Sequence, residues 1–233
     1  MRKRRKGAGR PPKNGMFAGE PHAPREELTR RDPVHVVIRP HRDVGNLRRR
    51  DIYAAVRRAL VVTFRRQDFR VVHLSIQGTH VHLLIEADGR EALARGMQGF
   101  EISAAKQINR ALSKRRHERR RGGVFPDRYH IEIIKSRRGA RHALSYVLNN
   151  WRKHEENLAT PDYRIDPFSS ASTFDGWADI EEPQAEVPDF EPLPVWRPKS
   201  WLLMRGWQMY GLLSWRETPR HRLVPRRVRA ARR

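Results

Sequence analysis

Residues 70–87 read RVVHLSIQGTHVHLLIEA, two largely apolar runs separated by Gly78 and Thr79. Alternation of apolar and polar residues with a high β-branched content is typical of strands, so we predict strands over 70–77 and 80–87. A short glycine-containing connection between two such runs is typical of a β-hairpin. The fold is therefore expected to contain an antiparallel sheet built around this hairpin.

The sequence on either side of the hairpin predicts five further elements. Strands are expected over 34–39 and 130–135, and helices over 47–66, 90–114 and 138–157. The resulting order is β-α-β-β-α-β-α, whose first six elements form the ferredoxin-like split β-α-β arrangement. We therefore predict an α/β (α+β) fold in which helices cover one face of an antiparallel sheet and the other face is left for a ligand. The seventh element is an extra C-terminal helix.

Composition divides the chain into four regions. Residues 1–33 form a basic arm without expected structure, suited to phosphate contact or serving solubility alone, and residues 34–158 form the folded domain. Residues 159–199 are interpreted as an acidic, proline-rich linker, a spacer in preference to an internal competitor for nucleic acid. Residues 200–233 hold a short amphipathic helix, expected over 200–215, and a second basic tail.

The overall charge of the chain points to a polyanionic partner. Among 233 residues, 49 Lys and Arg face 26 Asp and Glu, a formal net charge of +23, which favours nucleic acid over a membrane surface. The chain has no cysteine, which excludes a disulfide scaffold, a thiol nucleophile and a thiolate zinc site. Without a membrane-length apolar run or a secretory signal, we expect a cytoplasmic protein that binds no membrane.

Two histidines in the hairpin are candidates for metal binding. Alternate residues of a strand share a face, so His80 and His82 project together, with Leu84 and Glu86 further along the same face. Two imidazoles about 7 Å apart along a strand can converge on one divalent cation. Most such pairs are simply polar residues on a wet face, so this pattern alone does not establish a metal site.

The last predicted helix carries a tyrosine away from its apolar stripe. The stripe has helical spacing and consists of Leu144, Val147, Leu148 and Trp151. At about 100° per residue, Tyr146 lies on the other side of the helix. Asn150 follows it by one turn, and Lys153 and His142 share its polar stripe. A tyrosine at a helix margin is common, so it gains significance only together with the histidine pair.

Taken together, these parts resemble a known family. His80-Val81-His82 fits the His-hydrophobic-His signature, Tyr146 followed by Asn150 fits the catalytic helix, and residues 123–130 (GVFPDRYH) fit the segment between them. Over about half of its length the chain resembles the single-tyrosine HUH transposases, specifically the REP-associated tyrosine transposases. It departs from the pattern after Asn150, where many relatives have a proline and this chain has Trp151.

The resemblance implies a DNA strand transferase that acts on single-stranded DNA, a hairpin with a flanking cleavage site. Tyr146 would attack the scissile phosphorus and form a 5′-phosphotyrosine, which stores the energy for rejoining. Mg²⁺ or Mn²⁺ held by His80 and His82 would polarise the phosphate. Asn150 is the preferred third ligand. His154 and Glu86 remain the alternatives for that role.

The expected partner is single-stranded or hairpin DNA in a prokaryotic cytoplasm, where the protein would associate with the nucleoid. Candidate DNA contacts are Lys153, His142, Arg128, Arg115 and Arg116. The resemblance leaves open a homodimer that exchanges the tyrosine helix. One alternative is a DNA-hairpin-binding or regulatory protein that has lost cleavage, and another is a basic RNA-binding protein. Tyr129 is the competing nucleophile, although we expect it to pack or to stack on DNA, and His35 and His73 are expected to be hydrogen-bonded polar residues rather than ligands.

Overall fold

A computed structural model describes residues 27–159, 163–179 and 191–219 and confirms the predicted fold class. Four strands, β1 (Val34–Ile38), β2 (Phe69–Ile76), β3 (Val81–Ala87) and β4 (His130–Ile133), form one sheet in the order β2-β3-β1-β4. All three pairings are antiparallel. This is the strand order that the split β-α-β arrangement requires.

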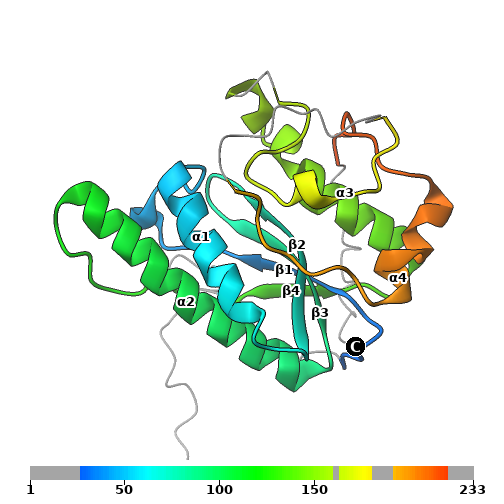
Figure 1. Ribbon diagram of the computed structural model, residues 1–233, viewed down its shortest axis with the longest axis horizontal. Helices are drawn as coiled ribbons and strands as arrows, with labels where there is room; N and C mark the ends of the chain where they lie inside the picture. The colour runs from blue at the N-terminus through cyan, green and yellow to red at the C-terminus, as the bar shows by residue number, and fades with distance from the viewer. Residues whose placement is uncertain (1–26, 160–162, 180–190, 220–233) are drawn as a thin grey trace, which may run out of the picture.

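Two helices, α1 (Arg50–Thr63) and α2 (Arg90–Arg116), cover one face of the sheet (Figure 1). The apolar residues of α1 recur at helical spacing and are buried against the sheet: Ala55, Val56, Ala59 and Leu60. Gly96 lets α2 approach closely, because a Cβ at this position would lie 2.1 Å from the ring of Phe69 in β2. The main hydrophobic core lies between these helices and the sheet.

The opposite face of the sheet is covered as well, which corrects the prediction that it is left for a ligand. The third helix, α3 (Arg137–Lys153), lies over this face (Figure 1). The predicted stripe of α3 is fully buried there, with Leu144, Val147, Leu148 and Trp151 at most 1% exposed. The helix begins at Ser136, whose side chain accepts from the amide of Gly139, and it ends four residues earlier than expected. What remains for a ligand is the margin of α3.

The C-terminal segment differs from the expected single helix. It forms a one-turn helix, α4 (Trp201–Met204), and a 3₁₀ turn, η5 (Gly206–Tyr210). The break falls at Arg205, and at the next residue, Gly206, a Cβ would lie 2.6 Å from the ring of Trp201. Trp207 and Leu203 are buried in a second hydrophobic cluster together with α3. The segment therefore packs on the tyrosine helix instead of forming a separate amphipathic helix.

The described parts of the expected linker also pack on the domain. Leu193 joins the main core, and Phe174 joins the second cluster. The buried carboxylate of Glu86 accepts hydrogen bonds from the backbone amides of Lys199 and Ser200. These contacts show that the linker is not a free spacer over the residues that the structure describes. The basic arm over 1–26 and the basic tail over 220–233 lie outside the described residues.

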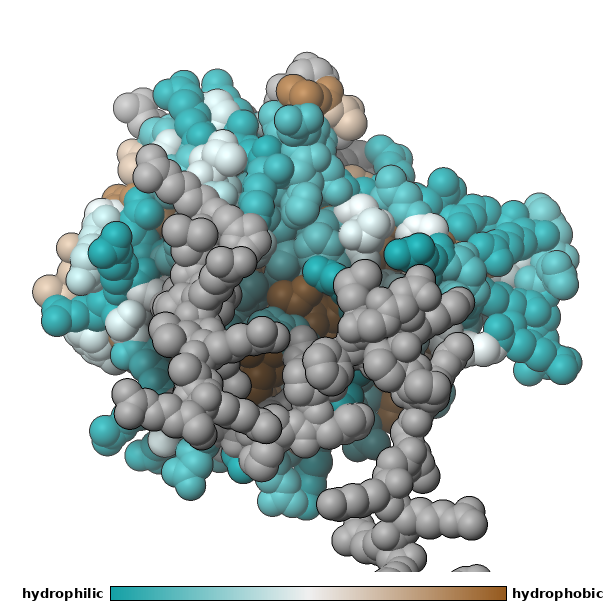
Figure 2. Space-filling view, turned by 180° about the vertical axis from the view of Figure 1, so that it is seen from behind, coloured by the Kyte–Doolittle hydropathy of each residue, from teal (hydrophilic) through white to brown (hydrophobic). Residues whose placement is uncertain are grey.

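The surface seen in Figure 2 is largely hydrophilic, with hydrophobic residues visible near the centre and at the top and left edges of this view. Within the described residues, no helix is long and apolar enough to cross a membrane.

Candidate active site

The hairpin turn places the two histidines of the signature side by side. The amide of Gln77 donates to the carbonyl of His80 at 2.9 Å, which closes the turn and leaves His80 just before β3. His82 follows within β3. Their ring centroids are 4.5 Å apart and the rings meet edge to face. Both side chains are buried, so the pair forms part of a packed site and not a wet strand face.

The tyrosine helix brings Tyr146 to this pair. The ring of Tyr146 lies 5.2 Å from the ring of His82, in an edge-to-face arrangement. Its hydroxyl accepts a hydrogen bond from Nζ of Lys153 at 3.1 Å. The ring of His142 stacks on its other side at 6.0 Å. The helix thus places the phenol of Tyr146, the ammonium of Lys153 and the imidazole of His142 together beside the histidine pair.

Asn150 contacts the same histidine from one turn further along α3. Its side-chain nitrogen Nδ2 lies 2.8 Å from Nε2 of His82. Its oxygen Oδ1 is buried and has no hydrogen-bond partner within the described part of the chain. Leaving a buried acceptor unpaired costs about 1–3 kcal/mol. The side chain that contacts His82 thus also has an unpaired oxygen, which makes this oxygen a candidate ligand atom.

Burial keeps the signature histidines neutral. Desolvation, together with repulsion from the neighbouring His154, Arg39 and Lys153, lowers the pKa of His80 to about 4. Desolvation also holds the pKa of His82 well below its usual value, with added repulsion from nearby histidines. A neutral imidazole has the lone pair that a metal ion requires. At neutral pH both rings are therefore in the protonation state of a ligand.

These residues fit a divalent cation. Two neutral imidazoles and the unpaired carbonyl oxygen of Asn150 are a mixed nitrogen and oxygen donor set. Across the described ranges, no three His, Asp or Glu side chains are grouped closely enough to hold a metal, although the ring of His154 lies 5.4 Å from that of His80. This geometry favours the amide as third donor. Glu86 is excluded from the site, because its carboxylate is bound to backbone amides and to Arg70.

The predicted DNA contacts divide into two groups. Lys153 and His142 lie at Tyr146, as described above. Arg115 and Arg116 lie at the end of α2, on the other side of the sheet from Tyr146, and their contact with DNA stays a prediction. Arg115 forms an ion pair with Asp51 at 3.1 Å. Arg116 donates a hydrogen bond to the backbone carbonyl of Asp43, in the 3₁₀ turn that precedes α1. These two arginines hold the end of α2 in place.

Arg128 and Tyr129 lie in the segment that leads into β4. The side chain of Arg128 is exposed to solvent. Tyr129 is partly buried and packs against the main core, as expected of a residue that belongs to the fold. Tyr146 is therefore the tyrosine that the fold brings to the candidate metal ligands.

Two features of the site were missed by sequence reasoning. His35 in β1 lies with Nε2 only 3.0 Å from Nδ1 of His82, so this expected polar residue is part of the site. A cavity of about 800 Å³ opens beside His80 and His154 and is lined by Arg39 and Arg42. Both features depend on strand pairing and turn packing, which no local pattern reveals. A basic cavity adjoining the histidines suits a phosphate backbone.

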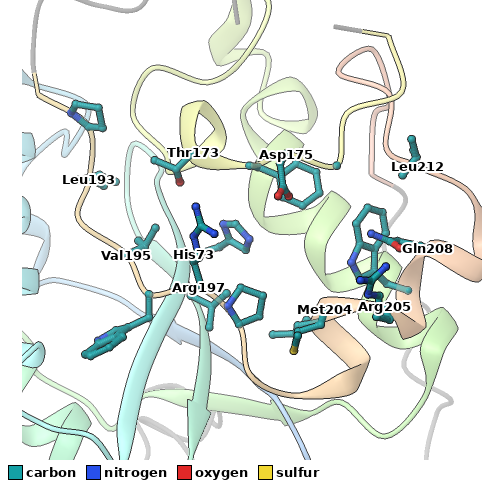
Figure 3. Close-up of a pocket in the computed structure, with 18 of the residues that line it drawn as sticks. His73, Thr173, Asp175, Leu193, Val195, Arg197, Met204, Arg205, Gln208 and Leu212 are labelled. Carbon is teal, nitrogen blue, oxygen red and sulfur yellow. The ribbon is translucent and has the colours of Figure 1, made fainter. Parts of the chain in front are cut away.

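A separate hollow of about 870 Å³ lies between β2, the 173–176 segment and the C-terminal segment (Figure 3). His73 lies at its centre, and Arg197 and Asp175 point toward it from neighbouring segments. Nδ1 of His73 lies 3.1 Å from the hydroxyl of Ser170, and burial lowers the pKa of His73 to about 4. None of the lining residues belongs to the group around Tyr146, so His73 is a buried histidine outside the candidate active site.

Comparison with known proteins identifies the family. A family model described as an IS200-like transposase matches residues 31–150, which is just over half of the chain and includes every histidine and tyrosine of the site except His154. A solved structure of a REP-associated tyrosine transposase bound to a REP hairpin shares the fold. Its TM-score is 0.52 at 16% identity, and the match covers 78% of this chain and 100% of that chain.

A putative transposase from Deinococcus radiodurans R1 is more distant, with a TM-score of 0.35 at 16% identity over 61% of this chain and 97% of that one. No curated protein matches this chain. The family match, which rests on sequence and spans the site, decides the assignment. The chain therefore belongs to the family of IS200-like transposases.

Proposed function

We propose that this transposase cleaves and rejoins single-stranded DNA beside a hairpin, with Tyr146 as the nucleophile, in the manner of REP-associated tyrosine transposases. The observation that carries the proposal is the position of the Tyr146 ring, 5.2 Å from the ring of His82, with Lys153 bound to its hydroxyl. The fold shared with a REP-associated enzyme, which is bound to a REP hairpin in its own structure, supports the choice of substrate.

In the proposed reaction, the oxygen of Tyr146 attacks phosphorus and the bond to the 3′ oxygen breaks. The products are a 5′-phosphotyrosine and a free 3′-hydroxyl, and the phenolic proton is passed through solvent to the leaving 3′ oxygen. Attack by another 3′-hydroxyl reverses the step and releases the phenol, so no nucleoside triphosphate is needed. The ammonium of Lys153 stabilises the phenolate both as nucleophile and as leaving group.

His80, His82 and Asn150 would hold the divalent cation, for which Mg²⁺ and Mn²⁺ are the candidates. When bound, such a cation polarises a non-bridging phosphate oxygen and offsets developing charge. Arg39 and Arg42 line the cavity beside the histidines and would bind the flanking strand through its phosphates. Because Tyr146 meets the histidines of its own chain, we infer that a single chain completes one site without helix exchange.

The test is a covalent trapping assay. The full chain is incubated with Mn²⁺ and a labelled hairpin oligonucleotide that carries single-stranded flanks, and the products are separated on a denaturing gel. We expect a protein–DNA adduct that disappears in Tyr146→Phe and persists in Tyr129→Phe. An adduct that persists in Tyr146→Phe would refute the assigned nucleophile. Hairpin binding without any adduct in the wild-type chain would favour the regulatory alternative.

A further inference from the structure

We propose that Glu156 is a positioning residue, which fastens the end of the tyrosine helix to the turn that carries His80. The consequence for cleavage rests on the proposed function, but the fastening itself is a property of the chain alone. Glu156 begins the 3₁₀ turn η3 (Glu156–Ala159), just after the end of α3. It lies outside residues 31–150, which the family model matches, so the family match assigns it no role.

The carboxylate of Glu156 reaches the turn between β2 and β3. Its Oε1 accepts a hydrogen bond from the backbone amide of Gly78 at 2.7 Å. A Cβ at Gly78 would lie only 3.1 Å from this oxygen, so the glycine leaves room for the contact. Within the same turn, the amide of Gln77 donates to the carbonyl of His80. The carboxylate therefore binds the short segment of backbone that leads into His80.

The second oxygen of Glu156 faces a buried arginine. Oε2 lies 3.4 Å from Nη1 of Arg48, an ion pair between side chains that are 19% and 9% exposed. The same nitrogen donates to the carbonyl of Ile76 at 3.0 Å and to Oδ1 of Asp166 at 2.9 Å. Oδ2 of the buried Asp166 accepts from the hydroxyl of Ser75 in β2. Because these other groups hold Arg48, Glu156 joins a cluster that is already anchored at the end of β2.

The contact joins the two elements that supply the candidate active site. α3 carries Tyr146 and Asn150, and the turn carries His80, which lies 78 positions before the end of this connection only in space and not in sequence: Glu156 and Gly78 are 78 positions apart. A misplacement of the reacting groups by about 1 Å can cost about 100-fold in rate, even when its cause lies away from the chemistry. Releasing this end of the helix should therefore loosen the placement of Tyr146 against the histidine pair.

Two substitutions separate the hydrogen bond from the charge. Glu156→Ala removes both contacts, whereas Glu156→Gln keeps an oxygen that can accept from the amide of Gly78 and loses only the ion pair. In the trapping assay, we expect Glu156→Ala to lower the single-turnover rate of adduct formation by about 10–100-fold. Glu156→Gln should retain most of the rate. In both variants the affinity for the hairpin, measured separately, should change much less than the rate does in Glu156→Ala.

A direct test of the placement needs neither DNA nor metal. In the full chain, the nuclear Overhauser effect between the ring protons of Tyr146 and His82 reports the approach of the two rings, whose centroids lie 5.2 Å apart. The signals are assigned by their loss in Tyr146→Phe and His82→Ala. We expect the effect in the wild-type chain and in Glu156→Gln, and a weaker effect in Glu156→Ala. Gly78→Ala crowds the same hydrogen bond from the turn and should act in the same direction as Glu156→Ala.

Glu155 supplies the matched control, because it is the adjacent acid and its side chain is exposed. Its φ is 57°, but Glu and Ala both carry a Cβ, so Glu155→Ala removes the charge at a similar backbone cost. This variant should change neither the rate nor the Overhauser effect. The proposal would be wrong if Glu156→Ala only lowered the free energy of unfolding, with both readouts unchanged. A wild-type chain that forms no adduct would refute the proposed function, while the Overhauser effect would still test the role of Glu156.

Discussion

The ammonium of Lys153 donates a hydrogen bond to the hydroxyl of Tyr146 at 3.1 Å and lies 4.8 Å from the centre of the same ring. The two residues are seven positions apart, which is two turns of α3, so the helix itself holds the cation over the phenol. A phenol has a pKa near 10 in water and is a weak nucleophile. A fixed positive charge at its oxygen stabilises the phenolate that the proposed reaction needs.

Removing this charge should slow cleavage. A hydrogen bond to a charged group contributes about 1.5–3 kcal/mol, so we expect Lys153→Met to lower the single-turnover rate of adduct formation by about 10–100-fold. Lys153→Arg keeps the positive charge and should lower this rate less than Lys153→Met does. The affinity for the hairpin, measured separately, should change much less than the rate. Equal losses in affinity and rate would show that Lys153 only binds DNA.

Stability should decrease as the pH falls below neutrality. The folded pKa of His73 and of His80 is about 4, against 6.5 for a solvent-exposed imidazole, because burial disfavours the charged form. Between these values the unfolded chain binds more protons than the folded chain, so the free energy of unfolding falls as pH is lowered from about 6.5 to 4. His73 alone accounts for on the order of 3 kcal/mol of this decrease in the free energy of unfolding.

Urea unfolding at a series of pH values measures this dependence. The curve should be flat above pH 7 and should fall steadily below pH 6.5. His73→Gln removes one of the buried rings and should flatten the curve, even if it lowers stability at pH 7. A free energy of unfolding that is constant between pH 7 and pH 5 would contradict the neutral, buried state of these histidines.

Local patterns were sufficient to predict the elements, because alternation and helical spacing depend only on nearby residues. The meeting of His82 with Tyr146 was expected from the family resemblance. The position of His35 in the site was not predictable, since it depends on the register between β1 and β3. The same holds for Glu86, which shares a face with the histidines but is bound by the amides of Lys199 and Ser200. Contacts between residues more than 100 positions apart carry no local signal.

The buried carboxylate of Glu86 should therefore matter for stability and not for metal binding. Its removal leaves Nε of the buried Arg70 and two backbone amides without their acceptor. Breaking a buried charge pair costs about 3–5 kcal/mol, so Glu86→Ala should lower the free energy of unfolding by that order. The Mn²⁺ affinity of the remaining folded protein should be unchanged. A specific loss of Mn²⁺ binding in Glu86→Ala would contradict this prediction and would indicate that Glu86 is a metal ligand.

The packing of α2 on the sheet offers a test with an internal control. A Cβ at Gly96 would lie 2.1 Å from the buried ring of Phe69, whereas among the described atoms nothing lies within 4 Å of a Cβ at Gly99. Gly96→Ala should destabilise the fold by about 3 kcal/mol, because the core cannot absorb the added group. Gly99→Ala should stabilise it by up to about 1 kcal/mol through helix propensity. Thermal melting of the two variants separates packing from propensity, and equal shifts would contradict the close approach.

The basic cavity predicts which arginines bind the DNA strand. Arg39 and Arg42 line the cavity beside His80, whereas Arg115 is paired with Asp51 at the far end of α2. Each phosphate contact on a single strand contributes about 0.7 to the slope of log affinity against log salt concentration. Arg39→Ala and Arg42→Ala should each lower this slope by about that amount, and Arg115→Ala should leave it unchanged. Binding of a hairpin with single-stranded flanks, measured between low and moderate salt, provides the slopes. A change confined to Arg115→Ala would place the strand on the α2 side of the sheet and away from Tyr146.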